Sequence, residues 1–166
     1  MKILIMGVSG CGKSSVGAAL AHHFNITYLD GDDFHPPENI KKMSTGTPLT
    51  DDDRLIWLQT LNQEYQKHDQ VIIACSALKA SYREILKHNN ADIITLYLDG
   101  TESVIWNRLQ HRKNHYFKGK SLLQNQLNTL EIPSKNDAIH ISIDQPLNDV
   151  VEQSIASISS PTKDSK

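Results

Sequence analysis

The chain has 166 residues, the length of one compact domain with at most a small inserted lobe. Charged residues make up 22% of the sequence and the formal net charge is -2, which argues against a disordered polyelectrolyte and against a basic nucleic-acid binder. Cys11 and Cys75 form no Cys-x-x-Cys or Cys/His cluster, which excludes a disulfide framework and a zinc site and favours a reducing compartment. The first apolar run, Ile3–Met6, is too short for a signal sequence or a membrane span, so we expect a cytoplasmic protein without membrane partners.

Apolar runs of strand length alternate with amphipathic runs of helix length along the chain. This is the pattern of a parallel sheet covered by helices on both faces, an α/β fold. In chain order we predict a strand over 3–6, a helix over 13–24, a strand over 26–30, helices over 38–43 and 51–68, a strand over 71–75, a helix over 78–87, a strand over 93–98, helices over 101–112 and 121–130, a strand over 138–143 and a helix over 147–158. Thr50 and Asp53 resemble a capping box at the start of the third helix. We expect a single domain over 1–158 and a disordered tail over 159–166.

The loop between the first strand and the first helix matches the phosphate-binding pattern G-x-x-x-x-G-K-[ST] in full. Its glycines allow successive backbone N–H groups to face phosphate oxygens, and the helix that follows adds the partial positive charge of its N-terminus. Lys13 is expected to reach the β- and γ-phosphates of ATP, and the Ser14 hydroxyl is expected to bind Mg²⁺. The predicted nucleotide-binding residues are Gly7, Val8, Ser9, Gly10, Cys11, Gly12, Lys13, Ser14 and Ser15.

A phosphate loop fits either a phosphotransferase or a nucleotide-sensing switch. A GTPase switch needs D-x-x-G and N-K-x-D motifs, and no glycine of this chain has an aspartate three residues before it. The run Ser134-Lys135-Asn136-Asp137 does not match the second motif. The compact length therefore favours a small-molecule kinase with a P-loop kinase fold.

Carboxylates follow the second predicted strand in Leu29-Asp30-Gly31-Asp32. The carboxyl end of a strand beside the phosphate-loop strand is where open α/β sheets bind ligands. On a continuing strand Asp30 and Asp32 share a face, whereas Gly31 permits a sharp turn between them. The third strand ends in Cys75-Ser76 and lacks the aspartate that usually serves magnesium there, so Asp30 is the best-placed carboxylate for Mg²⁺.

Several longer motifs point to one family. These motifs are the phosphate loop, Leu29–Asp32 with Phe34–Pro36, Asn39-Ile40 with Lys42-Met43, Gly46 with Pro48-Leu49, Asp51–Arg54 with Trp57-Leu58, Cys75–Lys79 with Tyr82-Arg83, Arg108-Leu109 with Arg112, His115 and Phe117, and Asp144–Leu147. With them the chain resembles the gluconokinases over nearly its whole length. The resemblance implies ATP- and Mg²⁺-dependent phosphorylation of D-gluconate at its 6-hydroxyl, a fold of the nucleoside-monophosphate-kinase type and a homodimer.

Gluconate is an anionic polyol, so its site needs cations for the carboxylate and polar groups for the hydroxyls. The candidate substrate-binding residues are Asp32, His35, Arg54, Lys79, Arg83 and His115, in an acceptor region over about 31–60 and beyond. By analogy with shikimate kinase, Asp30 holds magnesium-bound water and Asp32 accepts the proton of the acceptor hydroxyl, although these two roles can be exchanged. Shikimate itself is the alternative acceptor, but shikimate kinases carry a glycine run where this chain has Cys75-Ser76-Ala77.

The polar, basic segment over 113–120 is predicted to be a mobile lid over ATP. Arg112 is expected to reach the transferred phosphoryl group on closure, while Arg108 contacts the nucleotide. A solvated basic loop is the plainer alternative. Gln145 and Pro146 follow the fifth strand, where backbone groups shape the adenine pocket in kinases of this type.

Cys11 stands where many gluconokinases have serine. Inward-facing N–H groups and a helix N-terminus stabilise a thiolate. We therefore expect a reactive thiolate if the sulfur is accessible, and an inert thiol if it packs beneath the loop.

Overall fold

The computed structural model describes residues 1–111 and 120–160. Within them five parallel strands form one sheet in the order β2-β3-β1-β4-β5. The strands are β1 (Lys2–Met6), β2 (Thr27–Asp30), β3 (Val71–Ala74), β4 (Ile93–Asp99) and β5 (Ile139–Ser142). The predicted α/β fold with its five-stranded parallel sheet is confirmed.

The helices also follow the predicted pattern. They are α1 (Lys13–Phe24), α2 (Pro37–Ser44), α3 (Asp51–Lys67), α4 (Ala80–Lys87), α5 (Glu102–Gln110), α6 (Lys120–Thr129) and α7 (Leu147–Ser159). The predicted capping box is present, because the Asp53 N–H donates to Thr50 Oγ1 at 3.1 Å and the Thr50 N–H donates to Asp53 Oδ2 at 2.9 Å. One element was not predicted, the short 3-10 helix η1 (Gly31–Phe34). Ser159 belongs to α7 rather than to the predicted tail, most of which lies outside the described residues.

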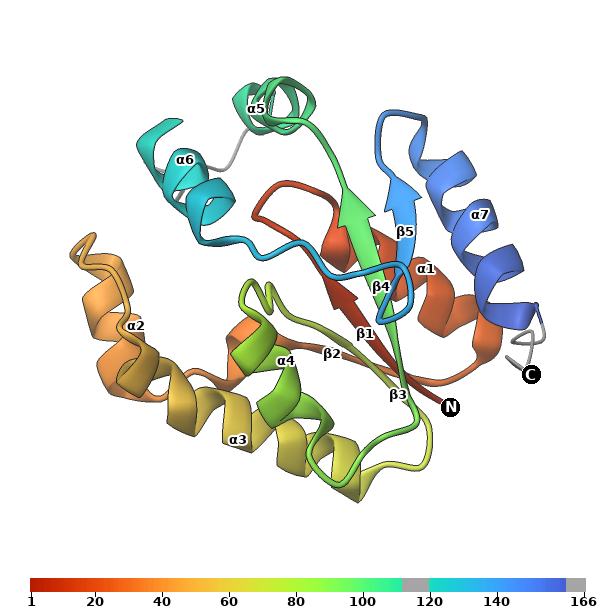
Figure 1. Ribbon diagram of the computed structural model, residues 1–166, viewed down its shortest axis with the longest axis horizontal. Helices are drawn as coiled ribbons and strands as arrows, with labels where there is room; N and C mark the ends of the chain where they lie inside the picture. Colours follow the sequence, from red (N-terminus) through yellow and green to blue (C-terminus); the bar gives the residue numbers. More distant parts are fainter. Residues whose placement is uncertain (112–119, 161–166) are drawn as a thin grey trace.

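Helices cover both faces of the sheet and give it two cores (Figure 1). Side chains of a strand alternate between the faces, so Ile3 and Ile5 point to one core while Leu4 and Met6 point to the other, all at 0% exposure. The first core is closed by α1, α5, α6 and α7, and the second by α3 and α4. Burial on both faces explains why the central strand is apolar throughout.

The carboxyl ends of the five parallel strands meet at one edge of the sheet. The phosphate loop leaves β1 there, η1 leaves β2, and the segment Cys75–Lys79 leaves β3. Ala74 is paired in register with both Ile5 and Asp30, which places Asp30 level with the end of β1. In Figure 1, α5 and α6 lie beyond this edge. The segments predicted to carry the chemistry are thereby gathered in one place.

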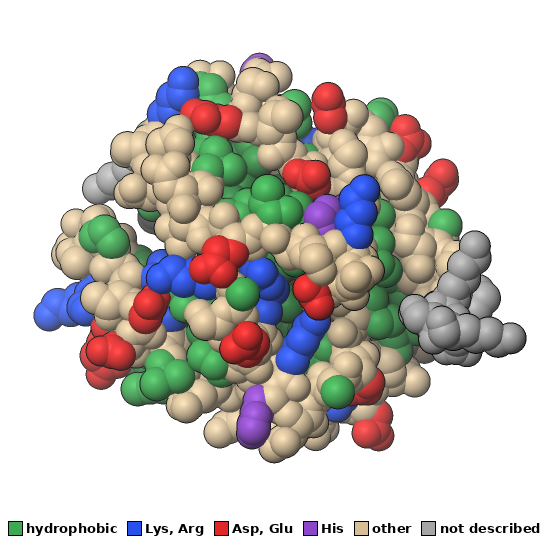
Figure 2. Space-filling model, viewed as in Figure 1, with side chains coloured by type: hydrophobic (Ala, Val, Ile, Leu, Met, Phe, Trp, Pro, Cys, Tyr) green, Lys and Arg blue, Asp and Glu red, His purple; other side chains and the backbone are tan. Residues whose placement is uncertain are grey.

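No helix among residues 1–111 and 120–160 is long and apolar enough to cross a membrane. Figure 2 shows Lys and Arg side chains intermixed with Asp and Glu side chains over the face in view. The face in view therefore carries no patch made of basic side chains alone.

Candidate active site

The phosphate loop is preformed around an anion-binding cradle. Gly10 and Gly12 have φ angles of 85° and 96°, the left-handed region that glycine adopts without steric strain. Gly12 precedes α1 and has no side chain to cap it, so the first N–H groups of the helix stay available to an anion. Lys13 Nζ donates to the carbonyl oxygens of Gly7 and Val8 at 3.0 and 3.1 Å, which holds the ammonium group across the loop.

The sulfur of Cys11 lies beneath this loop and not at its mouth. Cys11 is 1% exposed and belongs to the first core together with Val8 and Leu109. A Cβ atom added at Gly7 would stand 2.7 Å from Cys11 Sγ, so the sulfur fills the space under Gly7. The expectation of an accessible, reactive thiolate is therefore wrong, and the packed alternative holds. Burial also raises the pKa of the Cys75 thiol, to about 12.

Asp30 lies beside Ser14 at the edge of the cradle. The Ser14 hydroxyl donates to Asp30 Oδ2 at 3.4 Å, and Asp30 Oδ1 accepts the N–H of Asp32 at 3.0 Å as the cap of η1. The Tyr28 hydroxyl comes close to Ser14 but is buried without a hydrogen bond of good geometry.

This donor set fits a hydrated Mg²⁺. Magnesium takes hard oxygen ligands and keeps several of its waters, so the oxygens of Ser14 and Asp30 together with phosphates suffice. A metal-bound water would also satisfy the orphaned Tyr28 hydroxyl. Across the described residues no group of three or more His, Cys, Asp and Glu side chains offers a metal site made of protein ligands alone.

The turn that separates Asp30 from Asp32 is fixed by close packing at Gly31. A Cβ atom at Gly31 would lie 2.5 Å from the carbonyl oxygen of Ala74, so only glycine fits. The indole N–H of Trp57 donates to the Gly31 carbonyl at 2.7 Å. Trp57 is 3% exposed, so it is a core residue that also holds the turn. The chain therefore enters η1 here instead of continuing as a strand.

Asp32 presents its carboxylate to the space beside the phosphate loop. Desolvation in the cleft, followed by repulsion from Asp30, raises the pKa of Asp32, while Lys13 lowers it. Its side chain is nevertheless 83% exposed. Water therefore screens the charges around this accessible carboxylate until substrates cover it. Asp32 is thus an ionised, accessible base whose proton affinity is above that of a free aspartate.

His35 lies against Asp32 and is a neutral imidazole. Its Nε2 is 3.9 Å from Asp32 Oδ1, and its side chain is 4% exposed. The Asn39 amide donates to His35 Nδ1 at 3.3 Å and to the Asp53 carbonyl at 2.8 Å, so the proton of the imidazole sits on Nε2. Burial and then the charge of Arg54 lower the pKa of His35 to about 4. His35, predicted as one of the cationic or polar groups that bind the acceptor, is therefore a neutral polar group at neutral pH.

Arg54 and Lys79, both predicted to bind the acceptor, are brought together around one aromatic ring. The guanidinium carbon of Arg54 lies 5.7 Å and Lys79 Nζ lies 5.6 Å from the centroid of Tyr82. Lys79 also forms an ion pair with Asp51 at 3.0 Å. Arg54 donates to the Leu49 carbonyl through Nη1. The two cations therefore lie close to the same ring, an arrangement chemically suited to an anionic group.

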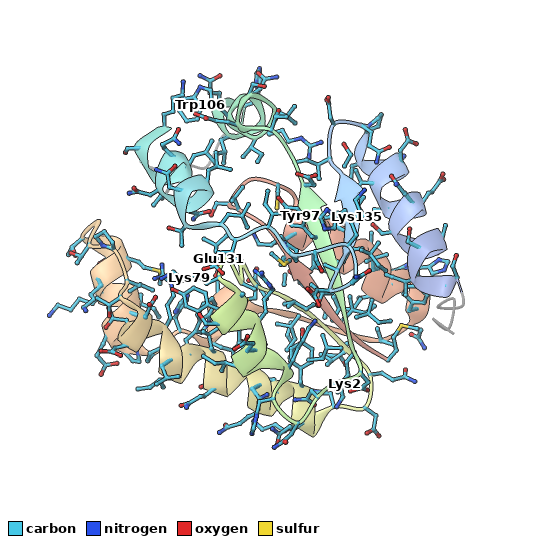
Figure 3. All side chains as sticks on the ribbon, viewed as in Figure 1. Lys2, Lys79, Tyr97, Trp106, Glu131 and Lys135 are labelled. Carbon is cyan, nitrogen blue, oxygen red and sulfur yellow. The ribbon has the colours of Figure 1, made fainter. Side chains whose placement is uncertain are left out.

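Arg83 has a different position from the one predicted. It is 8% exposed, and its guanidinium donates to the carbonyl oxygens of Ala77, Leu78 and Glu131 at 2.8, 3.1 and 2.9 Å. Figure 3 shows Glu131 and Lys79 close together near the start of α4. Arg83 therefore links the backbone after β3 to the backbone after α6. This position corrects the prediction that Arg83 is a gluconate ligand.

Arg108 lines a cavity of about 300 Å³ together with Val104, Asn107, Ile143, Asp144 and Gln145. Its guanidinium donates to the backbone carbonyls of Ile143 and Gln145 and lies 3.8 Å from the place of a Cβ at Gly12. The cavity therefore joins the phosphate loop to the segment that follows β5. Pro146, the residue after Gln145, is the N-cap of α7. A planar base fits a cavity of this size and position.

Arg112, His115 and nearly all of the predicted lid over 113–120 lie outside the described residues. Three residues that were not among the predicted site residues contact the site: Asn39 beneath His35, Tyr82 beneath Arg54, and Gln126 against the phosphate loop. Asn39 and Tyr82 belong to the family motifs but carry no predicted role. Gln126 follows the buried Leu123 at helical spacing, which was the available signal for a side chain facing inward.

Known proteins share this architecture. A model of the shikimate kinase family matches residues 9–159. Shikimate kinase from Aquifex aeolicus and the APS kinase CysC from Mycobacterium tuberculosis, both 18% identical with TM-scores of 0.64 and 0.68, have the same fold. The fold and the site define a P-loop kinase.

Higher similarity is found with the gluconokinases. The thermoresistant gluconokinase of Escherichia coli (strain K12) is 45% identical over 158 residues, which cover 92% of this chain and 90% of the relative. A crystal structure of a gluconokinase from Sinorhizobium meliloti 1021 has a TM-score of 0.89 at 44% identity and covers 95% of this chain and 91% of that one. The chain belongs to the gluconokinase family.

Proposed function

We propose that the protein transfers the γ-phosphoryl group of ATP to the 6-hydroxyl of D-gluconate, giving 6-phospho-D-gluconate and ADP. The gluconokinases of E. coli and Gluconobacter oxydans, 45% and 40% identical, support this activity. The observation that carries it is the position of Asp32. Its carboxylate is close enough to Lys13 for that charge to lower its pKa, and its Oδ1 lies 3.9 Å from Nε2 of His35.

The nucleotide half of the site consists of the phosphate loop, with its backbone N–H groups and Lys13 on the phosphates. Arg108 and Gln145 provide the base end, since they line the cavity, and Arg108 also lies close to Gly12. Pro146, the next residue, continues this segment into α7. Ser14 and Asp30 hold Mg²⁺, which when bound neutralises charge on the β- and γ-phosphates.

Asp32 is the general base. Its carboxylate takes the proton of the attacking hydroxyl while the oxygen of that hydroxyl bonds to the γ-phosphorus. The bond from the γ-phosphorus to the bridging oxygen breaks, and the electron pair leaves with ADP. A pKa raised above that of a free aspartate suits Asp32 to this transfer near neutral pH.

The acceptor half selects a polyol that carries a carboxylate. Arg54 and Lys79 bind the carboxylate, because they are the two cations gathered at Tyr82. Neutral His35 donates from Nε2 to a hydroxyl oxygen. Arg83 supports the segment between β3 and α4 from below.

The remaining assignments are a domain over 1–158 with an acceptor region over about 31–60, a lid over 113–120 carrying Arg112 and His115, a homodimer and a cytoplasmic location. The free, buried cysteines agree with a reducing compartment.

An ADP-release assay with a panel of acceptors tests the function. D-gluconate should stimulate ATP turnover far above shikimate or AMP. Equal stimulation by shikimate would favour the second candidate that the matching family model suggests, and no response to gluconate would refute the proposal.

A further inference from the structure

The tip of the phosphate loop is held by a side chain from a helix far along the chain. The N–H of Ser9 donates to Gln126 Oε1 at 2.7 Å, and Gln126 Nε2 donates to Ser9 Oγ at 3.0 Å. The amide of Gln126, on α6, therefore contacts both polar groups that Ser9 presents.

The position of Gln126 is set by packing on both sides of it. Leu123, one turn earlier on α6, is 0% exposed and belongs to the first core. After α6, the Glu131 N–H donates to the Leu78 carbonyl at 2.8 Å and Glu131 Oε2 accepts the N–H of Ala80 at 3.0 Å. With its helix held by Leu123 before it and by Glu131 after it, Gln126 is a fixed partner of the loop.

The phosphate loop itself is in contact with the neighbouring helix as well. A Cβ atom at Gly10 would stand 2.6 Å from Leu109 of α5, so the loop tip rests directly on that side chain. Ser9 thus hydrogen-bonds to Gln126 of α6, while the neighbouring Gly10 packs on Leu109 of α5.

The direction of these hydrogen bonds determines which hydrogen-bond donor of Ser9 remains available to a ligand. Its N–H is used by Gln126, so Ser9 does not add a backbone donor to the cradle. Its Oγ accepts from Gln126, so the hydroxyl proton is left to donate elsewhere. Ser9 lies between Gly7 and Gly10, at the turn of the loop that Lys13 spans.

We propose that Gln126 is a positioning residue for phosphoryl transfer: it fixes the Ser9 hydroxyl as a donor to the terminal phosphate of ATP. This inference rests on the nucleotide half of the proposed function and is independent of the acceptor. The Ser9 hydroxyl would thus recognise the γ-phosphate of ATP. ADP lacks this group, and only a triphosphate extends past the part of the loop that holds a diphosphate.

Equilibrium titration with Mg·ATP and Mg·ADP, without an acceptor, tests the inference. Gln126→Leu and Ser9→Ala should each weaken ATP binding about tenfold, the size expected for one hydrogen bond to a charged oxygen, and leave ADP affinity within about twofold. The double variant should be no weaker than either single variant, because the two residues act as one unit. Gln124→Ala, an exposed glutamine on the same helix, should bind both nucleotides normally.

Equal weakening of ATP and ADP would make the contact merely structural, and unchanged ATP affinity in Gln126→Leu would overturn the proposal. If Gln126→Leu does not fold, Ser9→Ala and Gln126→Glu decide instead. A carboxylate at 126 still accepts the Ser9 N–H but also takes the hydroxyl proton, so the preference for ATP should again be lost. A failure of gluconate as substrate would leave these binding results intact, which separates this inference from the proposed acceptor.

Discussion

The imidazole of His35 is stacked on the indole of Trp57, with ring centroids 4.1 Å apart and planes inclined by 16°. The same indole donates its N–H to the Gly31 carbonyl in the turn between Asp30 and Asp32. One tryptophan of α3 therefore fixes both the turn that carries the carboxylates and the imidazole beside them.

Trp57→Phe should keep the aromatic stack and lose only the hydrogen bond to Gly31. We expect the free energy of unfolding in urea to fall by about 1–2 kcal/mol, because a buried carbonyl is left without its donor. The value of kcat should fall as the turn loosens. Trp106→Phe, on the partly buried Trp106 of α5 (Figure 3), is the control and should not lower kcat. An unchanged kcat in Trp57→Phe would remove Trp57 from the positioning of the carboxylates.

Asp32→Asn removes the proposed base and should lower kcat by roughly 10²–10⁴-fold, about 3–5 kcal/mol of barrier. The protein should not lose stability. The pKa of Asp32 is raised in the folded state, so its ionised form disfavours folding at neutral pH, and asparagine relieves that repulsion. The melting temperature is expected to stay equal or to rise. Asp33→Asn, at an exposed neighbour, is the matched control with normal kcat. A drop in melting temperature that parallels the drop in kcat would instead indicate a structural role.

His35 makes folding stability depend on pH. Its folded pKa of about 4 is below the ordinary value of 6.5, so the unfolded chain binds a proton that the folded protein does not. Its contribution is present above pH 6.5 and is lost as the pH falls toward 4, at up to about 1.4 kcal/mol per pH unit. His35→Phe should flatten urea-unfolding stability in this window. Asp53, with its pKa lowered to about 2 by Lys42 and Thr50, acts only at lower pH. An unchanged slope in His35→Phe would contradict a neutral, buried imidazole.

Arg54→Gln should raise the KM for gluconate more than tenfold and change kcat much less, because the guanidinium binds the distant carboxylate in ground and transition states alike. Lys79→Gln should have a smaller effect, since Lys79 is already paired with Asp51. Lys41→Gln, at an exposed lysine of α2, is the charge-matched control. A normal KM in both Arg54→Gln and Lys79→Gln would place the carboxylate elsewhere.

Cys11 should resist iodoacetamide in the native protein, because its sulfur is covered by the loop and the first core. Mass-spectrometric mapping should find labelling of Cys11 and Cys75 only after unfolding, with no difference on adding Mg·ATP. Rapid labelling of Cys11 in the folded protein, slowed by Mg·ATP, would contradict the buried position.

The sequence predicted the sheet and the phosphate loop because both depend on local signals. Apolar runs define the strands, and the spacing of Gly7, Gly12 and Lys13 defines the loop. The sequence left open whether the chain turns at Gly31 or continues as a strand, since the choice depends on the contact of Gly31 with Ala74 and Trp57, both distant in the chain.

The sequence also could not predict the charge of the His35 side chain or the direction in which the Arg83 side chain points. The charge of His35 was left open by the sequence, and the imidazole is neutral because burial and then the charge of Arg54 lower its pKa. Arg83 looks like a ligand, but its guanidinium donates to the nearby carbonyls of Ala77 and Leu78 and to the distant carbonyl of Glu131. Asp30 and Ser14, both predicted to serve Mg²⁺, do lie within hydrogen-bond distance of each other, because the parallel strands bring their carboxyl ends together.

The central claim is that Asp32 activates the terminal hydroxyl of gluconate for attack on ATP, and the phosphorus-31 NMR spectrum of the product tests it most directly. A phosphate ester at the 6-position is coupled to the two protons of one methylene group, so the account predicts a triplet that appears with the wild-type protein and is nearly absent with Asp32→Asn. A doublet, from a phosphate on a secondary hydroxyl, or an undiminished triplet with Asp32→Asn would contradict it.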